Sequence, residues 1–137
     1  MKQFEIIEHT AEVGFRAYGT TLEEAFENSG RALFSLMTDL ERIEQDRELS
    51  FTLEAANREA LLYDFLDHLL YLRDTEGMLF AGFDASIDEV DGGYRIHASI
   101  RGCDSAEIPA QDVKAPTYSD MRIEDGDQVL IQVILDV

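Results

Sequence analysis

Hydrophobic and polar positions along the chain repeat with two different periods, which separates predicted strands from predicted helices. Residues 4–18 predict a strand that is interrupted near residues 9–12, because apolar and polar side chains alternate there. Residues 21–37 instead repeat their apolar side chains at helical spacing, and Thr21 opens a capping box that would begin the helix. The first third of the chain therefore predicts strand structure followed by one amphipathic helix.

The middle of the chain predicts a second strand and a second helix. Residues 47–57 alternate in the manner of a strand with one wet face, and Asn57 can cap the segment that follows. Residues 58–76 are apolar on most sides, which predicts a central and largely buried helix. Gly77 supplies the stop signal at its C-terminal end.

The last third of the chain predicts strands alone. The turn at residues 91–93 joins two strand-like runs into a hairpin. Residues 112–123 predict a short strand with a turn, and Pro116 excludes that strand from a central position. Residues 128–137 predict a strong final strand. The predicted fold class is α+β, with two helices packed on a curved, mostly antiparallel sheet in a single domain over residues 1–137.

Composition agrees with one globular domain, and charge narrows the classes of partner. The chain has 137 residues, of which 45% are hydrophobic and 29% charged. Eleven basic residues against 29 acidic ones give a formal net charge of −18. Such a surface repels phosphates, so strong direct binding to nucleic acid is not expected. The charge serves either solubility or the binding of a basic protein or a cation.

The cysteine count and the apolar runs exclude several classes of site and of segment. A single cysteine, Cys103, excludes an internal disulfide and a multi-cysteine zinc site. The first ten residues lack the apolar core of a secretory signal, and no apolar run approaches the roughly 18 residues of a membrane span. We therefore expect a cytoplasmic protein that does not enter membranes.

Two groups of residues could bind a metal. Asp64 and His68 lie four residues apart on the predicted central helix, which suits either a pair of metal ligands or a helix-surface ion pair. At the C-terminus, the Asp136 side chain and the carboxylate of Val137 follow a strong strand. If Glu12 lay near them, three acidic groups would favour a hard cation such as calcium or magnesium. The alternative is an acidic chain end that is merely solvated.

Four stretches, in this order, resemble the archease family. They are "EHTAEVGFRAYGTTLEEAFENSGRALFSLMTD", "LLYDFLDHLLYLRDTEG", "VKAPTYSDM" and the terminal "VILDV". Together they cover well over half of the chain, including both ends.

The resemblance implies a function without catalysis. Members of the archease family are protein cofactors of the tRNA-splicing RNA ligase, which joins 2′,3′-cyclic or 3′-phosphate ends to 5′-hydroxyl ends. They promote guanylylation of the ligase and its multiple turnover, and some members are linked instead to a tRNA methyltransferase as chaperone-like partners.

The resemblance also implies particular site residues. The family's metal site, which would hold a divalent ion such as calcium, falls on Glu12, Asp136 and Val137, and Glu12 stands where the family usually has Asp. Lys114 matches the lysine implicated in acting on the ligase. His9 and Asp64 match recurrent family positions, where an orienting or structural role is expected first.

One enzymatic alternative remains at this point. A small metal-dependent hydrolase could use Glu12, Asp64 and His68, although these residues form no recognised ligand pattern.

Overall fold

A computed structural model describes residues 2–9 and 12–137. Over these residues the chain forms two α-helices, one short 3₁₀ helix and seven strands. In chain order they are β1 (Phe4–His9), β2 (Glu12–Gly19), α1 (Leu22–Ser35), η1 (Leu40–Arg42), β3 (Arg47–Ala55), α2 (Arg58–Glu76), β4 (Met78–Val90), β5 (Gly93–Asp104), β6 (Ala115–Glu124) and β7 (Val129–Asp136).

Both helices begin where the sequence predicts. The Thr21 side chain accepts a hydrogen bond from the Glu24 amide at 3.1 Å, and the Asn57 side chain accepts one from the Ala60 amide at 2.8 Å. Each cap satisfies an amide that has no partner within the helix. Helix α2 ends at Gly77, whose φ of 62° is the left-handed conformation that glycine adopts without strain.

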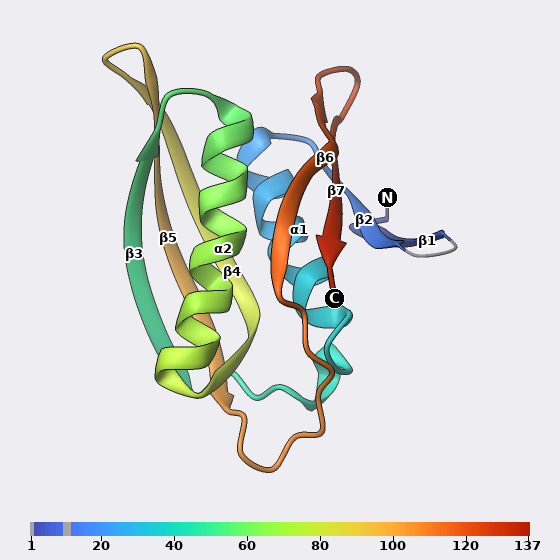
Figure 1. Ribbon diagram of the computed structural model, residues 1–137. Helices are drawn as coiled ribbons and strands as arrows, with labels where there is room; N and C mark the ends of the chain where they lie inside the picture. Colours follow the sequence, from blue (N-terminus) through green and yellow to red (C-terminus); the bar gives the residue numbers. More distant parts are fainter. Residues whose placement is uncertain (1, 10–11) are drawn as a thin grey trace.

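The strands divide between two antiparallel sheets. One sheet has the order β1-β2-β7-β6, and the other has the order β3-β5-β4. The two helices lie between them, since α1 contacts β2 and β4 while α2 contacts β6 and β3 (Figure 1). The α+β class with two helices on antiparallel strands is confirmed, and the strands form two sheets where the sequence predicted one.

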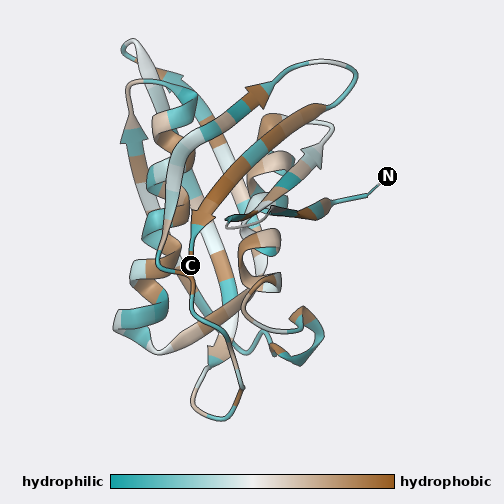
Figure 2. Ribbon diagram, turned by 45° about the vertical axis from the view of Figure 1, so that its right-hand side comes forward, coloured by the Kyte–Doolittle hydropathy of each residue, from teal (hydrophilic) through white to brown (hydrophobic). Residues whose placement is uncertain are grey.

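The predicted edge position of the Pro116 strand is confirmed. Strand β6 pairs with β7 alone, and its register shifts between Thr117 and Arg122. Asp120, inside this bulge, has a φ of 53°, which is uncommon for a residue other than glycine. Strand β7 lies between β2 and β6 and is hydrophobic along most of its length (Figure 2).

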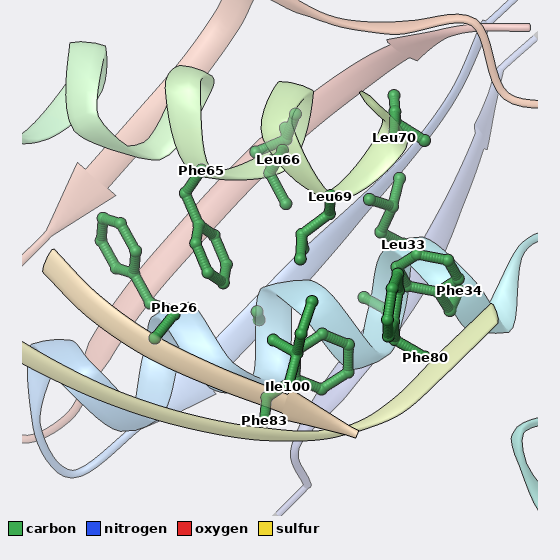
Figure 3. Packing of buried hydrophobic residues seen from close by; sticks show 14 of the residues in the cluster. Phe26, Leu33, Phe34, Phe65, Leu66, Leu69, Leu70, Phe80, Phe83 and Ile100 are labelled. Atoms are coloured by element: carbon green, nitrogen blue, oxygen red, sulfur yellow. The ribbon is translucent and has the colours of Figure 1, made fainter. Parts of the chain in front are cut away.

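The hydrophobic core fills the space between the sheets and the helices. Phe34 of α1 lies with its ring centroid 5.5 Å from that of Phe80 and 6.1 Å from that of Phe83, both on β4. Phe26 of α1 approaches Phe65 of α2 at 5.6 Å (Figure 3). These contacts join the two helices to each other and α1 to the three-stranded sheet.

Candidate metal centre

Two acidic strand ends meet at one end of the four-stranded sheet. Strand β2 begins at Glu12 and pairs antiparallel with β7, with Val13 opposite Leu135. Continuing this register by one residue puts Glu12 next to Asp136, the last residue of β7. Both residues are exposed, and Figure 2 shows the end of β7 beside the β1–β2 hairpin. The fold therefore brings together acidic residues that are 124 positions apart in sequence.

Lys114 reaches the same end of the sheet from the other side of β7. Ala115 lies opposite Asp136, and the Lys114 amide donates a 2.8 Å hydrogen bond to the Asp136 carbonyl. The Lys114 side chain is exposed. Its main chain is thus anchored to one of the two acidic residues, while the side chain can contact another molecule.

The chemistry of this cluster suits a hard divalent cation. Its donors are carboxylate oxygens, which calcium and magnesium prefer. Among the residues that the structure describes, no group of three or more His, Cys, Asp or Glu residues could hold a metal ion. Val137, which follows Asp136, is 56% exposed.

Asp64 and His68 lie elsewhere, on the exposed side of α2. Within the described part of the chain they form neither an ion pair nor a hydrogen bond with each other. His68 instead packs against Phe51, with ring centroids 4.5 Å apart. Burial lowers the pKa of His68, while burial and the neighbouring Asp67 raise the pKa of Asp64.

The combination needed for a hydrolase is not brought together over the described residues. Glu12 starts a strand of the four-stranded sheet, whereas Asp64 and His68 lie on α2. The side chain of His9 lies outside the residues that the structure describes, so its orienting role stays a prediction. Its main chain pairs with Glu12 across the β1–β2 hairpin.

Sequence reasoning missed a polar row on the outer face of the same sheet. Arg16 of β2 and Arg122 of β6 each donate a 3.0 Å hydrogen bond to the side-chain oxygen of Gln132 on β7. Gln132 is buried and also donates to the Asp120 carbonyl at 3.0 Å. Arg122 joins this row only because of the bulge between Thr117 and Arg122, and no sequence pattern predicts that bulge.

No described helix has the length and apolar character that a membrane span requires.

Comparisons with known proteins agree on one family. The family model of the Archease protein family matches residues 4–137. The protein archease of Pyrococcus furiosus is 43% identical over 127 residues, covering 90% of this chain and 89% of the relative. The protein archease of Methanothermobacter thermautotrophicus is 41% identical over 140 residues and covers all of both chains.

A solved structure shows the same fold. The solution structure of protein 1598 from Methanobacterium thermoautotrophicum matches with a TM-score of 0.87 and 40% identity, covering 100% of both chains. The family model, these two relatives and the solved structure agree. The chain belongs to the archease family.

Proposed function

We propose that this protein is a non-catalytic activator of the tRNA-splicing RNA ligase in the cytoplasm. It promotes guanylylation of the ligase and its multiple turnover during tRNA splicing and RNA repair, with a bound divalent metal. The observation that carries this proposal is the junction of Glu12, Asp136 and Lys114 at one end of a sheet, in a chain of the archease family.

The metal in this proposal is calcium, held by Glu12, Asp136 and the carboxylate of Val137. Two neighbouring carboxylates repel each other unless a cation lies between them, so a bound ion would relieve that repulsion. The side chain of Glu12 is one methylene longer than the Asp that is usual in the family. Calcium tolerates variable geometry better than magnesium does, which favours calcium at such a site.

Charge supports a protein partner that is basic because it handles RNA. The net charge of −18 would repel RNA itself and would attract a basic surface around a ligase active site. Lys114 and the bound cation would then face the nucleotide phosphates at that active site. A cation bound by Glu12 and Asp136 would lie at the same end of the four-stranded sheet as Lys114.

Reconstitution tests the proposal directly. The cognate ligase, RNA with 3′-phosphate and 5′-hydroxyl ends, GTP and substoichiometric amounts of this protein are mixed, and the turnovers per ligase are counted. We expect multiple turnovers with the protein and about one without it. Equal turnover in both reactions would refute the proposal.

Two further measurements separate the remaining alternatives. Affinity purification from the native cell should bring down the ligase; recovery of a tRNA methyltransferase in its place would favour the chaperone-like role. The isolated protein, incubated with divalent metals and phosphoester substrates, should show no hydrolysis. Metal-dependent hydrolysis that disappears in Glu12→Gln would identify an enzyme.

A further inference from the structure

The outer side of α2 forms the floor of a shallow groove next to β3. The groove has a volume of about 350 Å³, and we name it the α2 groove. Its lining residues are Leu53, Asp64, Asp67, His68 and Tyr71. In Figure 1 α2 lies between β3 and β6.

One exposed tyrosine ring lines the α2 groove, and a second packs on α2 outside its lining. Tyr71 is 58% exposed, and its ring lies 5.6 Å from that of His68. Tyr118 of β6 is 56% exposed and stacks on Tyr63 of α2 at 4.5 Å, with an angle of 8° between the rings. Large exposed aromatic rings such as that of Tyr71 are typical of interaction surfaces.

The carboxylates of the α2 groove have no cationic partner within the described residues. Arg58 pairs with Asp125 at 3.0 Å, and Arg73 pairs with Asp74 at 2.9 Å, so both arginines of α2 are engaged at its ends. The middle of the helix therefore presents Asp64 and Asp67 without a compensating charge. Burial and the proximity of Asp67 raise the pKa of Asp64, as expected for a carboxylate that lacks a cation.

We propose that the α2 groove binds an arginine side chain of a basic protein partner. The guanidinium group would stack on Tyr71 and donate hydrogen bonds to Asp64 and Asp67, which combines a cation–π contact with charge-assisted hydrogen bonds. Arginine fits better than lysine, because its planar group can stack and form hydrogen bonds at the same time. This proposal rests on the proposed function in one respect only, namely that the partner is a basic protein.

Two other classes of ligand fit this groove less well. Asp64, Asp67 and His68 do not form a metal site, since no group of three His, Cys, Asp or Glu residues that could hold a metal ion occurs among the described residues. A nucleic acid could stack on Tyr71, but Asp64 and Asp67 would repel its phosphates.

The groove and the candidate metal centre can contact the same partner. Tyr118 lies four residues from Lys114 along the chain that forms β6, a separation of about 13 Å in an extended strand. A partner that reaches Lys114 can therefore also contact Tyr118, which packs on Tyr63 of α2.

A peptide titration tests the groove without the ligase. ¹⁵N-labelled protein is titrated with an acetylated hexa-arginine amide, and the affinity is compared among four proteins: wild type, Asp64→Asn/Asp67→Asn, Tyr71→Ser, and Glu44→Gln/Asp46→Asn. Glu44→Gln/Asp46→Asn removes two negative charges, as Asp64→Asn/Asp67→Asn does. Glu44 and Asp46 are exposed and do not line the groove. Far-UV circular dichroism confirms that all four are folded.

We expect chemical-shift changes centred on residues 53 and 64–71, and an affinity at least fivefold weaker in both groove variants. The Glu44→Gln/Asp46→Asn control should bind within twofold of wild type. Equal losses in the groove and control charge variants, with no loss in Tyr71→Ser, would show attraction by net charge alone and would overturn the inference.

Ligase binding then separates this inference from the proposed function. If the wild-type protein stimulates the ligase, Asp64→Asn/Asp67→Asn should need at least a fivefold higher concentration for half-maximal stimulation than the control variant. Half-maximal stimulation at the same concentration of both variants would show that the groove does not contact the ligase. The proposed function would not be affected by that result. Failure of the wild-type protein to stimulate would refute the function alone, since the peptide result does not depend on it.

Discussion

The main chain of Lys114 is held by a hydrogen bond, while its side chain is exposed and free to contact another molecule. The amide hydrogen bond to Asp136 depends on the backbone, so removal of the ammonium group leaves that contact in place. The chain has only two lysines, Lys2 and Lys114. Lys2 pairs with Glu5 at the surface, at the opposite end of the β1–β2 hairpin.

Lys114→Ala is predicted to abolish stimulation of the ligase without changing the unfolding temperature. An exposed side chain without buried contacts contributes little to stability, whereas its charge would act directly on phosphate groups. Lys2→Ala removes the same charge and should stimulate as the wild type does. Turnovers per ligase measure the effect, and normal multiple turnover with Lys114→Ala would contradict the assigned role.

Glu12→Gln is predicted to weaken calcium binding at least tenfold, because the amide lacks the negative charge that a hard cation requires. Glu8→Gln is the matched control. Glu8 is exposed and lies opposite Val13, so it projects from the other face of the hairpin. Isothermal titration calorimetry with calcium measures both variants. Equal affinity in the two would remove Glu12 from the ligand set.

At the scale of elements, local signals predicted the helices well. Both caps lie where the sequence places them, and Gly77 ends α2 as expected. The first helix ends at Ser35, two residues before its predicted end, although Met37 is buried. The amide of Met37 bonds to the Phe34 carbonyl at 3.0 Å, so the last apolar residue belongs to a tighter turn after the helix.

Asn57→Ala is predicted to lower the free energy of unfolding by about 1 kcal/mol, because the Ala60 amide loses its side-chain acceptor. Asn57→Asp keeps an oxygen acceptor and adds a charge that the helix N-terminus favours, so it should be at least as stable as wild type. Urea unfolding followed by circular dichroism measures the difference. Equal stability of the alanine variant and the wild type would show that water replaces the cap without cost.

At the scale of the whole molecule, the strand order of the four-stranded sheet brings the residues of the candidate metal centre together. The candidate metal centre requires β7 to return between β2 and β6, so that Asp136 meets Glu12 on one side and Lys114 on the other. A divalent ion bound there would link β2, near the start of the chain, to β7, its last strand. Binding to the native state alone would then stabilise the whole fold.

Appending five residues after Val137 is predicted to weaken calcium binding sharply, because it moves the terminal carboxylate away from Asp136. Calcium at 100 times its dissociation constant should stabilise the wild type by about 2.7 kcal/mol and the extended protein by much less. Thermal unfolding with and without calcium measures this, and circular dichroism should show unchanged secondary structure. Equal stabilisation of both proteins would exclude the Val137 carboxylate as a ligand.

The sequence by itself determined the segments of this protein, because helix periodicity, caps and turn residues act within a few positions of one another. Asn57, Gly77 and the Asp91–Gly93 turn predicted element boundaries that the structure confirms. It also indicated the edge position of β6, since Pro116 cannot donate a hydrogen bond to a second neighbour.

Only the tertiary structure decided which strands pair and what their ends bring together. The pattern of apolar side chains shows that a strand has a buried face, but it does not name the partner or the register. The division into two sheets, the bulge before Arg122 and the meeting of Glu12 with Asp136 therefore depend on packing across the whole chain. The same holds for the α2 groove, because Leu53 of β3 lines it beside residues of α2 only once that strand lies against the helix.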